Sequence, residues 1–158
     1  MSFPQWLEPI DIRLTHWMAR NGLPLMRISL GLVFVWVGAL KFFPGLSPAE
    51  DLAGRTVQAL TFGTISPSVS VPVLATWECA IGLGLITAVW MRVTLFLLFT
   101  QMLGTLTPLI LFPHETFLRP PYAPTLEGQY IIKNFVLISG ALILGATVRG
   151  GKLEPDAK

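Results

Sequence analysis

The stretch that decides the fold is VSVPVLATWECAIGLGLITAVW, residues 69–90, in which Glu78 is the only charged residue. A helix of about 20 apolar residues is long enough to cross the ~30 Å hydrocarbon core of a bilayer. A carboxyl group at that depth costs at least ~2.5 kcal/mol on insertion scales, so such a residue usually faces the interior of a helix bundle and finds a partner there. The stretch therefore predicts a membrane protein with a buried polar site at Glu78.

Three further segments are apolar and long enough to cross a membrane, namely residues 23–43, 93–112 and 130–148. None of the four segments alternates between apolar and polar residues as a barrel strand does. Because only helices and closed barrels satisfy their backbone hydrogen bonds in lipid, we predict helices. The predicted fold is an all-α membrane protein, a four-helix transmembrane bundle in one domain that covers residues 1–158.

The composition agrees with this class and excludes several functions. Of 158 residues, 53% are hydrophobic and 13% charged, whereas a soluble domain has about 25% charged residues. The net charge of +2, without a basic cluster, does not indicate a nucleic-acid partner. Cys79 is the only cysteine, which excludes an internal disulfide, a CxxC redox centre and a cysteine-based metal site. We expect no metal site and no covalently bound cofactor.

The segment before the first span, residues 3–20, is amphipathic. Its apolar residues recur at helical spacing, with charged residues between them. A helix of this kind lies in the headgroup region of a membrane, so we predict an N-terminal interfacial amphipathic helix that anchors the first span. Docking of a partner subunit is the alternative interpretation.

The connections between the spans differ greatly in length. Only Met91 and Arg92 join the second and third spans, which must therefore form an antiparallel hairpin. The two long loops, residues 44–68 and 113–129, then lie on one face of the membrane. Within the first, PAEDLAGRTVQAL (residues 48–60) begins with a proline and two acidic residues, which favours a short helix.

The positions of the basic residues indicate the orientation. With the N-terminus in the cytoplasm, seven of the 11 basic residues lie on the cytoplasmic side and four on the other, so both termini are predicted to be cytoplasmic. The seven are Arg13, Arg20, Arg27, Arg92, Arg149, Lys152 and Lys158; the four are Lys41, Arg55, Arg119 and Lys133.

Polar residues gather in the half of the bundle that adjoins the two long loops. Glu78 lies roughly 10–12 Å along its helix from Ser70. Small residues near Glu78 on the helix surface, such as Gly82, allow another helix to approach, so Glu78 is predicted to face inward. The candidate ligand-binding residues are Lys41, Glu78, Gln101, Thr105, His114, Glu115, Lys133 and Asn134.

The predicted chemistry of this cluster depends on the partner of Glu78. A carboxylate next to the ammonium of Lys41 or Lys133 stays ionised, and one without a partner becomes neutral. In either state Glu78 is a candidate for exchanging protons or holding a polar ligand head. A purely structural pair that fixes helix register is the alternative, as are lysines that reach toward headgroups and a solvated role for His114 and Glu115.

Three stretches resemble the DoxX family of small bacterial four-helix membrane proteins. They are RISLGLVFVWVGALKFFP (27–44), WECAIGLGLITAVWMR (77–92), and TPLILFPHETF with TLEGQYIIKNFVLISGALILG (107–145). The resemblance covers nearly the whole chain from residue 25 and implies a location in the bacterial cytoplasmic membrane. Relatives include the small subunit of an archaeal thiosulfate:quinone oxidoreductase. Candidate residues lie in these stretches, but the resemblance assigns them no roles. The four-helix vitamin K epoxide reductases need paired cysteines, which this chain lacks.

These observations lead us to expect a quinone-linked accessory or anchor subunit of a membrane redox system. Glu78 would exchange a proton, Lys41 or Lys133 would hold a carbonyl oxygen, and electrons would come from a partner subunit, because the chain offers no set of redox-cofactor ligands. A binding or transport module for a small molecule, as a monomer or homo-oligomer, is the second interpretation, and a structural subunit of a larger complex is the third. A stand-alone enzyme is not expected, since no triad, phosphate loop or metal set appears.

Overall fold

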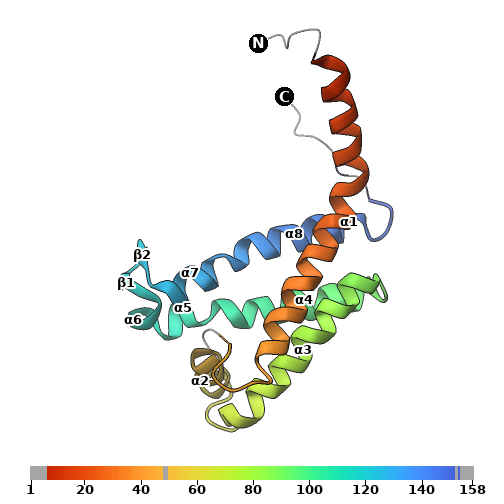
Figure 1. The fold of residues 1–158 in the computed structure, drawn as a ribbon. Coiled ribbons are helices and arrows are strands. Elements are labelled where there is room, and N and C mark those ends of the chain that lie inside the picture. Colours follow the sequence, from red (N-terminus) through yellow and green to blue (C-terminus); the bar gives the residue numbers. More distant parts are fainter. Residues whose placement is uncertain (1–6, 48–49, 152, 154–158) are drawn as a thin grey trace.

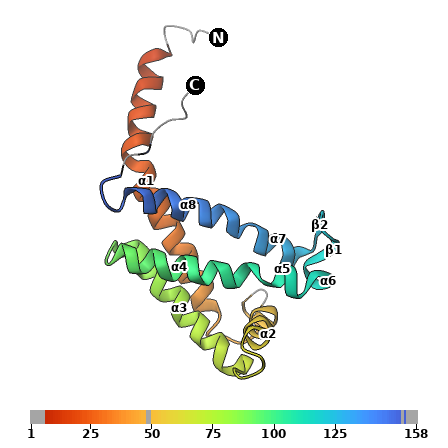
Figure 2. The same cartoon turned by 180° about the vertical axis from the view of Figure 1, so that it is seen from behind.

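The computed structural model describes residues 7–47, 50–151 and 153, and these are mostly helical. By length and composition, four helical spans can cross a membrane: Glu8–Leu40, Pro67–Thr87, Met91–Leu111 and Leu126–Thr147. This confirms the predicted all-α class with four membrane-spanning helices. Figures 1 and 2 show how the spans pack obliquely against one another, with short elements gathered at one end.

The first span belongs to a helix longer than predicted. Helix α1 (Glu8–Leu40) runs for 33 residues without interruption, and its first turns extend beyond the other helices (Figure 1). The described part of the predicted amphipathic segment is thus helical but continuous with the first span, its interfacial location stays a prediction, and residues 3–6 lie outside the described residues. The helix continues through Pro24, which removes one backbone donor, and the side-chain amide of Asn21 donates to the carbonyl of Trp17 (2.8 Å).

The second and third spans form the predicted hairpin. Helix α3 (Pro67–Thr87) turns into α4 (Met91–Leu106) through Ala88 and Trp90, both of which adopt positive φ angles of 58° and 48°. The predicted boundaries of 69–90 and 93–112 are therefore shifted toward the N-terminus.

The third span is also broken near its end, at Thr107. Pro108 has no N–H and begins the separate α5 (Pro108–Leu111), and Pro113 begins α6 (Pro113–Thr116). The predicted span over 93–112 is therefore present as Met91–Leu111, with an interruption at Thr107.

The fourth span starts earlier than the predicted residue 130. The hydroxyl of Thr125 accepts a hydrogen bond from the Gly128 amide (3.1 Å) and so caps α7 (Leu126–Ile132). Lys133 interrupts the span, which continues as α8 (Asn134–Thr147). A hairpin of β1 (Phe117–Arg119) and β2 (Ala123–Pro124) precedes α7.

The short helix predicted in the first long loop is present as α2 (Glu50–Leu60). Together with α6 and the β1–β2 hairpin, it covers one end of the bundle, which we name the capped end (Figures 1 and 2). Leu52, Gly54 and Thr56 of α2 are buried. One side of this amphipathic helix therefore faces the bundle, and its side chains close the bundle at this end.

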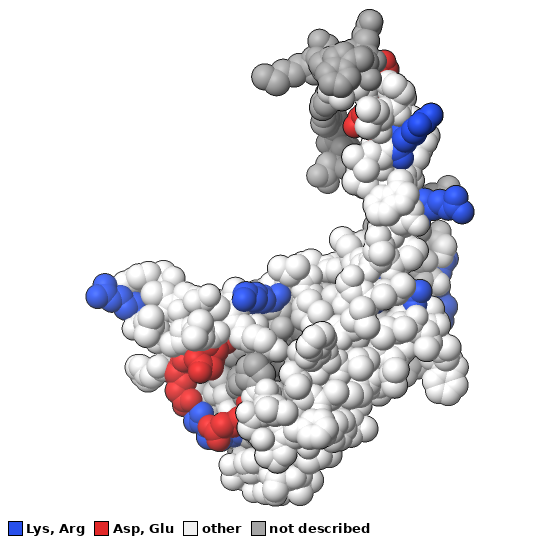
Figure 3. All heavy atoms as spheres, in the orientation of Figure 1, with Lys and Arg blue, Asp and Glu red and all other residues white. Residues whose placement is uncertain are grey.

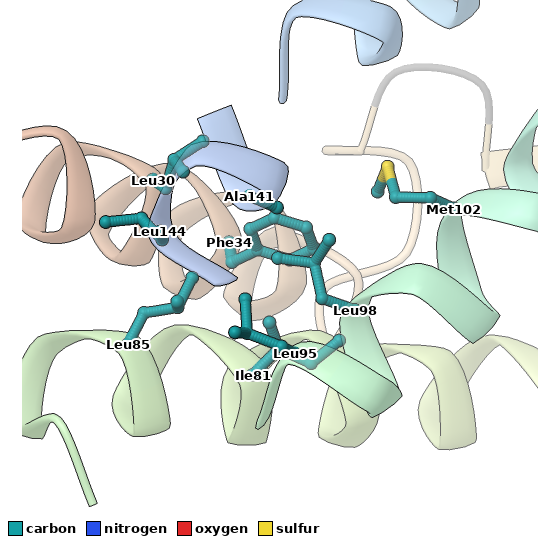
Figure 4. Close-up of a cluster of buried hydrophobic side chains, with 9 residues drawn as sticks. All are labelled: Leu30, Phe34, Ile81, Leu85, Leu95, Leu98, Met102, Ala141 and Leu144. Atoms are coloured by element: carbon teal, nitrogen blue, oxygen red, sulfur yellow. The ribbon is translucent and has the colours of Figure 1, made fainter. Parts of the chain in front are cut away.

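The apolar core lies in the half of the bundle away from the capped end. Side chains from α1, α3, α4 and α8 meet there (Figure 4): Leu30, Phe34, Ile81, Leu85, Leu95, Leu98, Met102, Ala141 and Leu144. Ile81 and Leu98 are fully buried, and each lies one helical turn from a polar residue, Glu78 and Gln101 respectively. The polar cluster is thus sealed on one side by the core, so that access comes from the capped end or from the side of the bundle.

Candidate functional site

Glu78 is the centre of a buried cluster drawn from three helices. The Nζ of Lys41, just after α1, donates to Glu78 Oε2 at 2.6 Å, and Nε2 of Gln101 in α4 donates to Glu78 Oε1 at 2.6 Å. Lys41, Glu78 and Gln101 are 8%, 6% and 5% exposed. Each carboxylate oxygen therefore has a strong donor, and the negative charge of Glu78 is balanced by the ammonium of Lys41.

The close approach of α1 and α3 places Lys41 against Glu78. Gly31 and Gly38 of α1 and Gly82 of α3 lie in the contact, where added side chains would collide with the opposite helix. Gly38 is one turn before Lys41 and lies directly against Glu78. At the other end of the contact, the guanidinium of Arg27 donates to the carbonyls of Leu85 and Ile86, the second at 2.7 Å, which caps α3 and fixes its register against α1.

The cluster opens into a cavity of about 300 Å³, which we name the bundle cavity. Its lining comes from α1, α2, α3, α4 and the α7–α8 span, and most of it is apolar, including Phe34, Leu52, Trp77 and Met102. Lys41, Glu78 and Gln101 supply its polar end, and Thr105 and Asn134 lie on the same wall, where Asn134 Nδ2 donates to Thr105 Oγ1 at 3.4 Å. An apolar chamber with a few converging polar groups is the usual form of a small-molecule site.

Lys133 does not take part in this cavity. It is exposed, and the alternative pairing of Glu78 with Lys133 is wrong, because Lys41 is the partner. Successive residues of a helix point about 100° apart, so only one of Lys133 and Asn134 can face the bundle, and it is Asn134.

His114 and Glu115 also lie outside the bundle cavity. Both are exposed on α6, and Glu115 forms a two-pronged ion pair with Arg55 of α2 at 2.8 and 2.5 Å. Arg55 in turn bonds Asp51 at 2.7 Å and stacks over the ring of Phe112, with 5.2 Å from its guanidinium carbon to the ring centroid. The hydrogen bond to Glu115 raises the pKa of Arg55, and the bond from Arg55 lowers the pKa of Glu115. Glu115 therefore ties α2 to α6.

A second and wider hollow, which we name the outer hollow, has a volume of about 1090 Å³ and lies beside α2, between the end of α1 and the start of α3. Its charged lining consists of Glu50, Asp51, Glu115 and Glu127 with Arg55 and Lys41. Figure 3 shows acidic side chains gathered around basic atoms at this end, while the surface over the helices is mainly uncharged. Lys41 lines both the outer hollow and the bundle cavity, so its side chain lies between them.

Sequence reasoning missed several residues that shape the bundle cavity. Tyr130 and Trp77 line it, and so do Leu52, Thr56 and Leu60 of α2. The spacing of four residues between Leu52, Thr56 and Leu60 marks one face of a helix and was a usable signal. Nothing in the sequence indicated that this face would cover the space beside Glu78, because that depends on how the loop folds back.

One polar atom of the cluster has no partner. Oε1 of Gln101 is buried and accepts no hydrogen bond from the part of the chain that the structure describes. A buried carbonyl without a donor costs free energy, which is recovered when a donor reaches it.

Searches against protein-family models, curated proteins and solved structures found no match to this chain.

Proposed function

We propose that this chain is a quinone-linked accessory or anchor subunit of a membrane redox system, and that the bundle cavity holds the quinone head group. The observation that carries the proposal is the charge-balanced cluster of Lys41, Glu78 and Gln101 at the polar end of an otherwise apolar cavity within the spanning helices. Such a cavity suits a molecule that is apolar along most of its length and polar at one end.

The residues present fit a quinone head. The volume of about 300 Å³ lies at the lower end of the range for small-molecule sites. The flat ring of Trp77 and the apolar side chains of Phe34 and Met102 suit a ring, and the charged groups of the lining are the paired Lys41 and Glu78. A bound quinone supplies two-electron redox chemistry coupled to two protons.

Lys41 and Glu78 would have separate tasks toward such a head group. An ammonium carries three N–H donors, and Lys41 spends one of them on Glu78, which leaves donors for a carbonyl oxygen in the cavity. Glu78 would hold or release a proton at its carboxylate, with Lys41 stabilising the ionised state and Gln101 orienting it. Because Lys41 also lines the outer hollow, protons would exchange with water on the capped side.

The wider setting belongs to the same proposal. The resemblance to the DoxX family and the distribution of basic residues support a bacterial inner-membrane protein with both termini in the cytoplasm. The protruding start of α1 carries an apolar stripe that includes Ile10, Leu14 and Trp17, which suits either the headgroup region or a partner subunit. The electrons would come from a redox subunit bound to the chain.

A pair of matched substitutions on α2 tests the site. Ala53 lines the bundle cavity, whereas Ala59 is exposed on the same helix. In lipid nanodiscs, Ala53→Phe is expected to abolish equilibrium binding of a decyl-tailed benzoquinone, and Ala59→Phe to leave it unchanged. Binding by Ala53→Phe with wild-type affinity would place the site elsewhere.

A second experiment tests the redox role. The complex extracted with its native lipids is analysed by mass spectrometry for co-purifying subunits and for quinone. Quinone enriched over the bulk membrane, together with a redox partner, supports the proposal. In that complex, Glu78→Gln is expected to lower turnover, and unchanged turnover would remove Glu78 from proton exchange.

A structural subunit is the second candidate, because the Lys41–Glu78 pair joins α1 and α3 at one end of their close contact. If the chain is a structural subunit, Glu78→Leu is expected to prevent assembly of the complex, rather than to slow turnover in a complex that still assembles. A stable complex that contains no quinone favours this candidate.

A further inference from the structure

The polar end of the bundle cavity contains a buried hydrogen-bond acceptor without a donor among the described residues. Oε1 of Gln101 accepts nothing from the described residues. The carboxylate of Glu78 has room for about four hydrogen bonds and receives two. The amide of Gln101 cannot be reversed to remove the mismatch, since Oε1 would then face the carboxylate and Nε2 would lose its acceptor.

None of the described neighbouring groups, Tyr130 of the cavity lining included, donates to Gln101 Oε1. Asn134 donates to Thr105, and the hydroxyl of Thr105 donates to the carbonyl of Met102 in its own helix at 2.9 Å. Lys41 points its bonded N–H at the other carboxylate oxygen. Within the cluster, both carboxylate oxygens of Glu78 receive a hydrogen bond, whereas the side-chain carbonyl of Gln101 receives none. A ligand can supply the donor that this carbonyl lacks.

We propose that the bundle cavity selects a ligand whose head group carries a hydroxyl donor, so that the reduced hydroquinone binds more tightly than the oxidised quinone. This inference rests on the proposed function and deepens it. A quinone oxygen only accepts hydrogen bonds, whereas a hydroquinone hydroxyl both donates and accepts. One hydroxyl donates to Gln101 Oε1, with the bond from Gln101 Nε2 to Glu78 kept. The same oxygen accepts from Lys41.

The preference follows from how binding sites discriminate. A site built to receive a hydroxyl rejects an analogue that lacks it, because the buried polar group is then left without a partner. Gln101 Oε1 stays buried without a donor when the cavity holds a quinone head, because the quinone oxygens only accept hydrogen bonds. We expect the hydroquinone to bind roughly tenfold more tightly than the matching quinone, as follows from the cost of one unsatisfied buried acceptor.

The test compares the two oxidation states of one ligand. Equilibrium affinities of decyl-tailed benzoquinone and benzohydroquinone are measured without oxygen, with the full chain in nanodiscs. Gln101→Met, which keeps length and removes the acceptor, is expected to reduce the preference to about twofold or less. Thr100→Val is the matched control: Thr100 also lines the cavity, but its hydroxyl bonds Phe96 in its own helix, so the preference is expected to persist.

The outcomes separate the two proposals. Equal wild-type affinity for both forms, or tighter binding of the quinone, overturns the hydroxyl preference and leaves the quinone site standing. A preference that persists in Gln101→Met overturns the role of Gln101. Failure of both forms to bind the wild-type protein overturns the proposed function itself. The wild-type comparison decides the preference even if Gln101→Met does not fold.

Discussion

Gly38 lies so close to Glu78 that a Cβ atom at position 38 would come within 2.8 Å of the Cβ of Glu78. The same added atom would also meet the backbone of Ala75 and Cys79 at 3.0 Å. The absence of a side chain at Gly38 thus sets the distance between α1 and α3. Because Lys41 follows Gly38 by one turn, the close contact at Gly38 also sets where the ammonium of Lys41 meets the carboxylate of Glu78.

Gly38→Ala is therefore expected to push α1 from α3 and destabilise the protein by about 1–3 kcal/mol, the usual cost of overpacking. Gly22→Ala is the matched control, because Gly22 lies in the same helix and has open space around its Cβ position. Replacing that glycine is expected to be neutral or stabilising by up to about 1 kcal/mol. Thermal unfolding in detergent measures both. Equal stability of the two variants would show that the glycine contact does not hold the helices together.

The Lys41–Glu78 pair is expected to be strongly coupled. Lys41→Met leaves a buried carboxylate without its counter-charge, which costs about 3–5 kcal/mol, and Glu78→Leu leaves the ammonium in the same position. The double variant Lys41→Met with Glu78→Leu is expected to recover most of the loss, since no buried charge remains. Lys133→Met serves as the control and is expected to be nearly neutral, because Lys133 is exposed. Additive losses in the double variant would argue against a direct pair.

The attachment of α2 is expected to weaken in acid. The hydrogen bond from Arg55 holds the folded pKa of Glu115 below its ordinary value of 4.5. A carboxyl group with a lowered folded pKa contributes stability above its ordinary pKa and loses that contribution as pH falls through the folded value. Protection of the α2 amides, taken relative to the intrinsic exchange rate at each pH, is therefore expected to fall as pH drops below about 4.5 toward the folded pKa of Glu115, through which the Arg55–Glu115 bond is lost.

Two variants test that cause. Glu115→Gln is expected to have faster α2 exchange at neutral pH and a flatter dependence on pH in the acid range. Glu127→Gln removes another carboxylate from the outer hollow and is the control. If Glu115→Gln showed the same loss of α2 protection in acid as the wild-type protein, the loss would have to come from protonation of another group.

The proposed orientation predicts where each face can be labelled. A single cysteine at Arg119, in the β1–β2 hairpin of the capped end, is expected to react with a membrane-impermeant maleimide added outside intact cells. A cysteine at Arg92, in the first turn of α4, is expected to react only after lysis. Both are made in a Cys79→Ala background. The reverse pattern would invert the topology.

Several features of the fold were predictable because their causes are local. Hydropathy over a window of 20 residues predicts the four spans, and a short link between the second and third spans leaves only a hairpin, although the link lies at residues 88–90 and not at Met91 and Arg92. The acidic start of α2 predicted a short helix. The break at Thr107 and Pro108 was also a local matter, but the apolar run on either side concealed it. Local propensity did not indicate that α1 would continue through Pro24, because a proline inside a helix removes a backbone donor.

The sequence by itself determined that Glu78 lies among apolar residues within a spanning helix and needs a partner, because the cost of a charge in hydrocarbon depends on depth along one segment. Only the tertiary structure decided that Lys41 is that partner and Lys133 is not, that Gln101 completes the carboxylate, and that α2 closes the bundle cavity. These outcomes depend on the rotation and register of helices against one another. Contacts such as that of Gly38 with Glu78 set both, and they join residues far apart in the chain.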